Sequence, residues 1–251
     1  MKIIKFLAIL MLVPSLCFGS VSRTFDGADD ELVTSSSVYN PKGVASSLIV
    51  WIYCTDNTKT QYILSTTNGS IRSYSLLIFG ADGTGRIQIQ IADTTNNAAN
   101  FLIRKSVSGT IANNTWTAVA ITHTGTWSTA TDAHLYKNLV EPSYLLSQNG
   151  AATEADHTGN WWVGGHPTLT TTGFWGNLSY AQVFSRVVSI PELTEFTYKP
   201  DMANNLLKAH WPVWGDGTEI DLSGNGKTGA VTGTTTSTSG PPVMFGGGLP
   251  L

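Results

Sequence analysis

Apolar and polar residues alternate with a period of two in several short stretches of the chain. The clearest stretch is 86–91, Arg-Ile-Gln-Ile-Gln-Ile, which places three isoleucines on one face and polar side chains on the other. This alternation is typical of an antiparallel strand with one buried face. The stretch 73–79 precedes it, and the glycine-rich segment 80–85 between the two favours a hairpin.

Other short apolar stretches follow at fairly regular intervals, with turn residues between them. The segment 48–53, Leu-Ile-Val-Trp-Ile-Tyr, is apolar almost throughout, which favours a central strand. The remaining predicted strands are 62–64, 116–122, 133–136, 161–163, 178–184 and 205–214. Many short strands separated by turns predict an all-β fold of two antiparallel sheets packed as a sandwich.

One segment has the pattern of a helix, directly after the strand predicted at 178–184. Ser189 suits the N-cap position and Pro191 suits the first turn, while Glu192 stands three residues after Ser189, as in a capping box. Leu193 and Phe196 then form an apolar face. We expect this helix to cover one end of the sandwich.

The first nineteen residues have the features of a cleavable signal peptide. Lys2 and Lys5 flank the start of an apolar stretch that continues to Val13, and Gly19 is small enough for cleavage before Ser20. The apolar stretch is shorter than the roughly 20 residues that span a bilayer. We therefore expect a secreted protein, extracellular or periplasmic, with no transmembrane segment after cleavage.

The mature chain is expected to form one domain over 20–236, followed by a flexible tail over 237–251. The tail contains two adjacent prolines and three consecutive glycines. The preceding Thr-, Ser- and Gly-rich tract, 232–240, has low complexity, but its threonines also permit an edge strand.

The charge of the chain excludes some classes of partner, and its cysteine content predicts a free thiol. Lys2 and Lys5 are two of the 14 basic residues, so 12 remain in the mature chain against 17 acidic residues, and no basic cluster occurs. Nucleic acid and anionic membrane surfaces are therefore not expected partners. If Cys17 leaves with the signal peptide, Cys54 is the remaining cysteine, and its apolar surroundings predict a buried, inert thiol.

Five segments, in this order, resemble laminin-G-like domains of the concanavalin A-like lectin/glucanase superfamily. The last of them contains an aromatic, a glycine, a strand and a capped helix, and the segments are 25–30, 47–53, 114–120, 134–138 and 163–195. The resemblance implies a jelly-roll sandwich that binds a carbohydrate or a glycoconjugate. It also implies calcium as a possible cofactor, because some family members bind calcium with carboxylates in turns.

A sixth resemblance lies at the C-terminal end of the chain. Residues 206–212, followed by 221–226, resemble the segment that usually opens such a domain. One interpretation is a circular permutation, in which this segment supplies the strand that normally precedes Phe25. The other is a truncated second repeat, but about 45 residues cannot bury a sandwich core, so we favour the permutation.

The triplet Glu219-Ile220-Asp221 resembles the Glu-x-Asp-x-Glu motif of retaining β-glucanases. In that motif a period of two places three carboxylates on one face of a strand. Here Ser223 stands in the third position, so the carboxylate needed for acid/base catalysis is missing. We interpret Glu219 and Asp221 as part of a structural turn, and we expect no catalytic residue.

Asp26, Asp29 and Asp30 are clustered in one predicted turn. Carboxylates in turns are calcium ligands in this family, and solvated carboxylates without an ion are the alternative. The five histidines stand singly, without the short spacing of a transition-metal site, so no other cofactor is expected.

Tryptophans outside the predicted core strands are candidates for stacking on sugar rings. Trp127 lies in a polar loop. Trp161 and Trp162 are adjacent in a strand, so their side chains point to opposite faces and one must leave the core. The polar residues Asp156, His157 and Asn160 stand beside them. The predicted carbohydrate site is Trp127, Asp156, His157, Asn160, Trp161 and Trp162; the alternative is that these aromatics pack a loop against the sheet.

These patterns predict a secreted, non-catalytic carbohydrate-binding module that recognises a polysaccharide or a surface glycan. Two other classes stay open. A structural or adhesion module of a cell surface or virion would bind a protein partner instead. A glycoside hydrolase or lyase would need two carboxylates about 5–10 Å apart across a groove.

Overall fold

The computed structural model describes residues 21–35, 37–67, 72–80, 84–167, 169, 171–200, 206–214 and 217–243. The predicted signal peptide, the middle of the turn predicted at 80–85 and the end of the predicted tail lie outside these residues.

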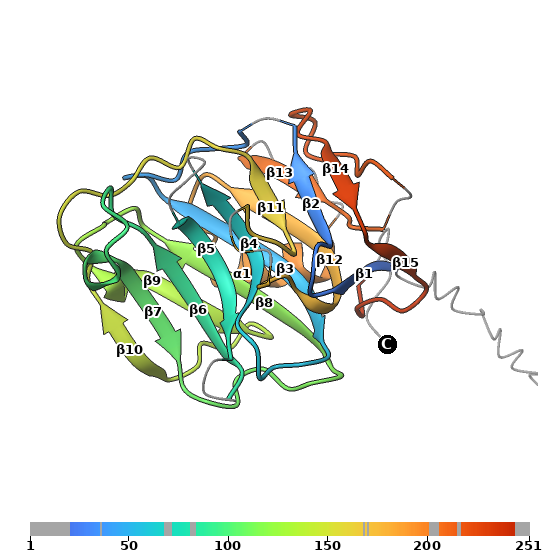
Figure 1. The fold of residues 1–251 in the computed structure, drawn as a ribbon, viewed down its shortest axis with the longest axis horizontal. Coiled ribbons are helices and arrows are strands. Elements are labelled where there is room, and N and C mark those ends of the chain that lie inside the picture. Colours follow the sequence, from blue (N-terminus) through green and yellow to red (C-terminus); the bar gives the residue numbers. More distant parts are fainter. Residues whose placement is uncertain are drawn as a thin grey trace, which may run out of the picture.

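The described residues form two antiparallel β-sheets packed face to face (Figure 1), which confirms the predicted sandwich. The seven-stranded sheet has the order β15 (Thr235–Ser237), β1 (Ser22–Asp26), β12 (Trp175–Phe184), β3 (Ser46–Cys54), β8 (Trp116–His123) and β9 (Ala133–Lys137), with β13 (Leu207–Trp211) also paired to β12. The eight-stranded sheet has the order β10 (Tyr144–Gln148), β7 (Leu102–Ser106), β6 (Arg86–Ile91), β5 (Arg72–Phe79), β4 (Gln61–Thr67), β11 (Trp161–Val163), β2 (Glu31–Thr34) and β14 (Gly229–Thr232). Two short 3-10 turns, η1 (Ala98–Asn100) and η2 (Ala130–Asp132), complete the set.

The core lies between the sheets and follows the predicted alternation. Ile87, Ile89 and Ile91 of β6 are fully buried in it, and the predicted hairpin is present, with β5 and β6 paired from Phe79 opposite Arg86. The polar face of β6 differs from the expectation of a half-buried strand, because Gln88 is also almost fully buried. The residues directly opposite Gln88, Leu77 of β5 and Lys105 of β7, place their side chains beside it on the same face and limit its exposure.

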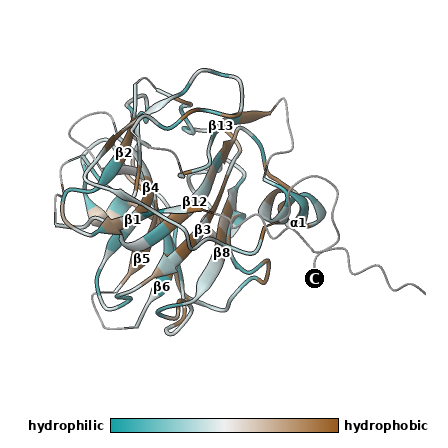
Figure 2. Ribbon diagram, turned by 90° about the vertical axis from the view of Figure 1, so that its right-hand side faces the viewer, coloured by the Kyte–Doolittle hydropathy of each residue, from teal (hydrophilic) through white to brown (hydrophobic). Residues whose placement is uncertain are grey.

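Helix α1 (Ile190–Tyr198) begins with the predicted capping box of Ser189 and Glu192. The expectation that it covers one end of the sandwich was wrong, since the helix packs on the outer face of the seven-stranded sheet (Figure 2). The ring of Phe196 stacks on Phe184 of β12 at 5.0 Å, and Ile49 of β3 lies in the same apolar cluster. The strands of this sheet carry apolar residues on both faces, so the outer face also needs a cover.

The C-terminal segment contributes strands to both sheets. Strand β13, which confirms the strand predicted within 205–214, pairs with the second half of β12, on the same side as β1, which pairs with the first half. Strand β15 pairs with β1, and β14 pairs with β2 at the edge of the other sheet. The C-terminal strands therefore lie beside the N-terminal strands (Figure 1).

Cys54 has a free, fully buried thiol, as predicted. Within the described part of the chain, no helix combines the length and apolar character needed to cross a membrane.

Candidate ligand-binding site

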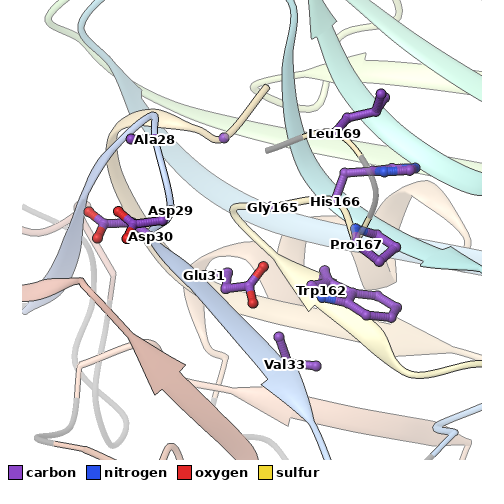
Figure 3. A pocket seen from close by; sticks show the side chains of 11 residues that line it. Ala28, Asp29, Asp30, Glu31, Val33, Trp162, Gly165, His166, Pro167 and Leu169 are labelled. Atoms are coloured by element: carbon purple, nitrogen blue, oxygen red, sulfur yellow. The ribbon is translucent and has the colours of Figure 1, made fainter. Parts of the chain in front are cut away.

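An open cavity of about 350 Å³ lies on the outer side of the eight-stranded sheet, where β2 and β11 meet two loops (Figure 3). The loops run from 27 to 30 and from 164 to 173. The cavity is lined by Ala28, Asp29, Asp30, Glu31, Val33, Trp162, Gly165, His166, Pro167, Leu169 and Gly173.

Strand alternation places Trp162 in this cavity. The adjacent Trp161 is fully buried in the core, and its indole N–H donates to the carbonyl of Tyr39 at 3.2 Å. Trp162 therefore points outward and is half-buried, beside its pairing partner Val33 of β2. One of the two tryptophans does leave the core side, as the alternation predicted.

Glu31 lies on the same outer face of β2 as Val33, two residues away. Its carboxylate is directed toward Trp162, whereas the carboxylates of Asp29 and Asp30 point to the other side of their turn (Figure 3). A Cβ added at Gly165 would lie 3.0 Å from the Cβ of Glu31, so this glycine leaves room for the glutamate. Burial, with a smaller contribution from the charge of Asp29, raises the pKa of Glu31.

The far wall of the cavity comes from the loop after β11. The imidazole of His166 is 3% exposed and lies 4.5 Å from the ring of Tyr62, measured between centroids. Pro167 and Leu169 add half-buried apolar surface. Among the described lining residues there is no lysine or arginine, so the charged side chains at the cavity are carboxylates.

The predicted acidic cluster borders this cavity. One carboxylate oxygen from each of Asp26, Asp29 and Asp30 lies within 4.8 Å of the others. The turn is held by two backbone N–H groups, since Ala28 donates to Asp26 Oδ1 at 2.9 Å and Asp26 donates to Asp30 Oδ2 at 2.7 Å. Burial raises the pKa of Asp30, and the charges of Asp26 and Asp29 add to the rise.

This turn fits a metal ion by the chemistry of its donors. Three carboxylates in one turn provide the hard oxygen ligands that calcium and magnesium take. Burial is the main cause of the raised pKa of Asp30, and a bound cation would offset the smaller contribution from the charges of Asp26 and Asp29. The acidic triad could therefore hold a metal ion.

The structure places the other residues of the predicted carbohydrate site outside the cavity lining. His157 is fully buried, with Nε2 3.5 Å from Glu154 Oε1, and Asp156 is exposed and paired with Lys42 at 3.2 Å. Asn160 is half-buried just before β11. Trp162 and the predicted calcium turn are thus brought together, whereas the six residues of the predicted carbohydrate site do not form one group.

Trp127 holds its loop against the sandwich. The indole is half-buried against the core, and its N–H donates to the carbonyl of Ala151 at 3.2 Å. Gly150 lies directly beside the ring, where a Cβ would approach to 2.3 Å. This arrangement corresponds to the loop-packing alternative.

Glu219 and Asp221 have structural roles. Glu219 is 1% exposed and paired with Arg23. Asp221 accepts backbone N–H groups from His210, Ser223 and Lys227 at 2.8–2.9 Å, which organises the turn after β13. Neither carboxylate lines the cavity.

Sequence reasoning missed Glu31 and His166. The alternation in 31–34, Glu-Leu-Val-Thr, does indicate a short strand with Leu32 inward and Glu31 outward, and this signal could have identified the glutamate. Nothing in the loop around His166 indicates that it packs back over the sheet.

Two antiparallel sheets packed face to face, with an open cavity on an outer face, define a β-sandwich protein. A laminin G family model, described as concanavalin A-like lectin/glucanases superfamily, matches residues 26–194. The chain belongs to the concanavalin A-like lectin/glucanase superfamily. No curated protein sequence matches the chain significantly.

Solved structures with the same fold are distant in sequence. A candidate carbohydrate-binding protein from Bacteroides ovatus is 16% identical, with a TM-score of 0.64 over 90% of this chain and 61% of its own. A heptameric SAP-like pentraxin from Limulus polyphemus is 14% identical, with a TM-score of 0.60 over 88% of this chain and 96% of its own. The chain thus spans about three fifths of the length of the Bacteroides protein, and at these identities the likeness shows the fold alone.

Proposed function

We propose that this chain is a secreted, non-catalytic carbohydrate-binding module and that the ligand binds in the cavity beside Trp162. The observation that carries the proposal is a half-exposed indole next to a carboxylate in an open cavity. Sugars present apolar C–H faces that stack on aromatic rings, and hydroxyls that donate to carboxylate oxygens. The description of the Bacteroides ovatus structure as a candidate carbohydrate-binding protein agrees with this ligand class.

The lining assigns different tasks to its residues. The indole of Trp162 would stack on one face of a sugar ring, with Pro167 and Leu169 as further apolar surface. Glu31, whose carboxylate points toward the indole, would accept hydrogen bonds from hydroxyls. A volume of about 350 Å³ is near the lower end for ligand pockets, which suits a terminal sugar unit better than a long polysaccharide segment.

We further propose that Asp26, Asp29 and Asp30 hold calcium. The ion would neutralise the three carboxylates and order the turn that forms one side of the cavity. Its contribution to binding would then be structural, through the position of Asp29 and of the start of β2.

The non-catalytic assignment is supported by the placement of the glucanase-like triplet, since Glu219 is buried in an ion pair and Asp221 organises a turn. Secretion is supported by the sequence features of residues 1–19.

A glycan-array screen of the purified mature protein, residues 20–251, tests the proposal in calcium and in chelator. We expect binding to a defined set of glycans, lost in Trp162→Ala and largely kept in Trp162→Phe, which preserves an aromatic face. Trp127→Ala is the matched control, because this tryptophan lies outside the cavity lining and should bind as the wild type does.

Two results would overturn the proposal: a folded wild-type protein that binds no glycan, or a Trp162→Ala variant with unchanged binding. Release of reducing sugar from a bound glycan would contradict the non-catalytic assignment and favour a hydrolase. Circular dichroism of each variant shows that the loss of binding does not come from unfolding.

A further inference from the structure

The charged side chains at the cavity are all acidic among the residues that the structure describes. Asp29, Asp30 and Glu31 line it, Asp26 adjoins it, and no described lining residue is basic. A cavity of this kind creates a negative potential that attracts cationic groups and repels carboxylates and sulfates.

Glu31 differs from the three aspartates in its surroundings. The aspartate carboxylates lie together, and two of them accept backbone N–H groups of their own turn. Glu31 has no ion pair or hydrogen bond through its side chain to any residue that the structure describes, and its carboxylate points into the cavity toward Trp162. The carboxylate oxygens of Glu31 can therefore accept hydrogen bonds from a ligand.

Glu31 also stands outside the triad that could hold a cation. A divalent ion there would cancel much of the charge of Asp26, Asp29 and Asp30, but it would leave the carboxylate of Glu31. The negative charge next to Trp162 thus persists with or without such an ion.

Resting on the proposed function, we propose that this cavity selects glycans that carry a free, protonated amine, such as an N-unsubstituted hexosamine unit. The ammonium group donates to the carboxylate of Glu31 and lies against the face of Trp162. Both contacts favour a cation, since the hydrogen bond is charge-assisted and the indole ring attracts a positive charge at its face. N-acetylation removes the charge, and a uronate or sulfated sugar brings a charge of the wrong sign.

The selection should be measurable as a ratio of affinities. Hydrogen bonds to charged groups are worth enough to change an affinity by about tenfold to a hundredfold when one partner is lost. We therefore expect an unsubstituted glucosamine oligosaccharide to bind at least about tenfold more tightly than its N-acetylated counterpart of equal length.

Isothermal titration calorimetry of the mature protein tests this with four tetrasaccharides: glucosamine, N-acetylglucosamine, neutral glucose and galacturonate, all of the same length. Glu31→Gln keeps the size of the side chain and removes the charge. It should reduce the preference for the amine over the neutral sugar to less than about threefold. Glu195→Gln, an exposed position on α1, is the matched control for a change in net charge and should behave as the wild type does.

The pH dependence provides a readout that needs no variant. Raising the pH above the pKa of the sugar amine should abolish the preference in the wild type, because the ligand loses its charge.

The possible failures are distinguishable. Binding of the neutral or acetylated sugars as tight as that of the amine overturns this inference and leaves the proposed carbohydrate site in place. Preference for the galacturonate also overturns it. A folded protein that binds none of the four sugars, nor any glycan of the array, overturns the proposed function together with this inference.

Discussion

Arg23 of β1 and Glu219 of the C-terminal segment form an ion pair in the interior, with Nε 3.0 Å from Oε1 and side chains that are 2% and 1% exposed. The guanidinium also donates to the hydroxyl of Thr234 at 3.0 Å and to the carbonyl of Gly217 at 3.3 Å. One residue of the first strand thus fixes three points of the C-terminal segment. Because the family match ends at 194, this segment lies outside the matched domain, and Arg23 joins it to the sandwich.

Breaking this pair should destabilise the fold strongly. In Glu219→Gln the guanidinium of Arg23 keeps its charge but loses the carboxylate of Glu219, and breaking a buried ion pair in this way costs about 3–5 kcal/mol in comparable sites. Urea unfolding, monitored by tryptophan fluorescence, measures the free energy of unfolding. The double variant Arg23→Met, Glu219→Leu should recover part of the loss, because an apolar pair avoids the cost of desolvating charges.

The exposed pair of Lys42 and Asp156 is the control for this comparison. Its side chains are 33% and 60% exposed, so Asp156→Asn should change stability by no more than about 1 kcal/mol. An equally small effect of Glu219→Gln would show that the C-terminal segment does not depend on the buried pair.

Gly176 permits the close approach of β12 to β3. Its φ of +130° is one that residues with a side chain rarely adopt, and a Cβ there would lie 1.9 Å from the carbonyl oxygen of Tyr53. The carbonyl belongs to the backbone of a central strand, so it cannot move aside cheaply. Gly176→Ala should therefore lose several kcal/mol of stability or yield no soluble, folded protein, as judged by circular dichroism.

A substitution at Gly109 shows how much stability is lost through a positive φ alone, without a steric clash. Its φ is +70°, but nothing lies within 4 Å of an added Cβ. Gly109→Ala should therefore cost about 1 kcal/mol, the usual penalty of this backbone conformation. Equal losses in the two variants would contradict the steric explanation.

Alternation and capping were sufficient to predict most central strands and the helix. The isoleucines of β6, the apolar β3 and the Ser189 capping box are local signals that the tertiary structure reinforces. The short strands β2, β7 and β10 were not predicted, because the alternation in four or five residues, although present in 31–34, does not by itself separate a strand from a loop.

The cavity was predictable only in part, for a physical reason. Alternation could say that Trp161 and Trp162 face opposite ways, but not which of them is buried. That depends on how β11 pairs with β2 and β4, which are about 130 and 100 residues away in the chain. The residues that line the cavity with Trp162, Glu31 and the acidic turn, are likewise distant in the chain. A search for polar residues near Trp162 in the sequence therefore selected Asp156, His157 and Asn160 instead.

Acid should destabilise the protein through His210. Burial lowers the pKa of this histidine to about 4, with the charge of Asp221 acting against the shift. An unfolded histidine titrates near 6.5, so between about pH 6.5 and pH 4 the unfolded chain binds a proton that the folded chain does not. Stability from this group is therefore lost as the pH falls through that window, by up to about 3 kcal/mol.

A comparison of variants isolates this contribution. Burial also lowers the pKa of His123, so this histidine too makes the fold less stable as the pH falls. The raised pKa values of Asp30 and Glu31 have the opposite effect on stability. The difference in free energy of unfolding between pH 7 and pH 5 should be smaller in His210→Asn than in the wild type. Equal pH dependence in wild type and His210→Asn would show that His210 does not resist protonation.

Calcium should stabilise the acidic turn if Asp26, Asp29 and Asp30 bind it together. At a concentration of about one hundred times its dissociation constant, an ion that binds the folded state alone adds about 2.7 kcal/mol to the free energy of unfolding. Thermal unfolding in calcium and in chelator measures this, with magnesium as a test of selectivity for the larger ion. Asp30→Asn should remove the calcium effect, while Asp132→Asn, at a half-buried aspartate outside the triad, should keep it.

The same variant separates a metal site from solvated carboxylates. In chelator Asp30→Asn should be at least as stable as the wild type, because the amide oxygen still accepts the N–H of Asp26 and the repulsion from Asp26 and Asp29 is gone. If the three aspartates bind an ion, Asp30→Asn should therefore lower the stability in calcium but should not lower it in chelator. Identical melting curves of the wild type in calcium and chelator would establish that the turn is held by its two backbone hydrogen bonds, to Asp26 and Asp30, and not by an ion.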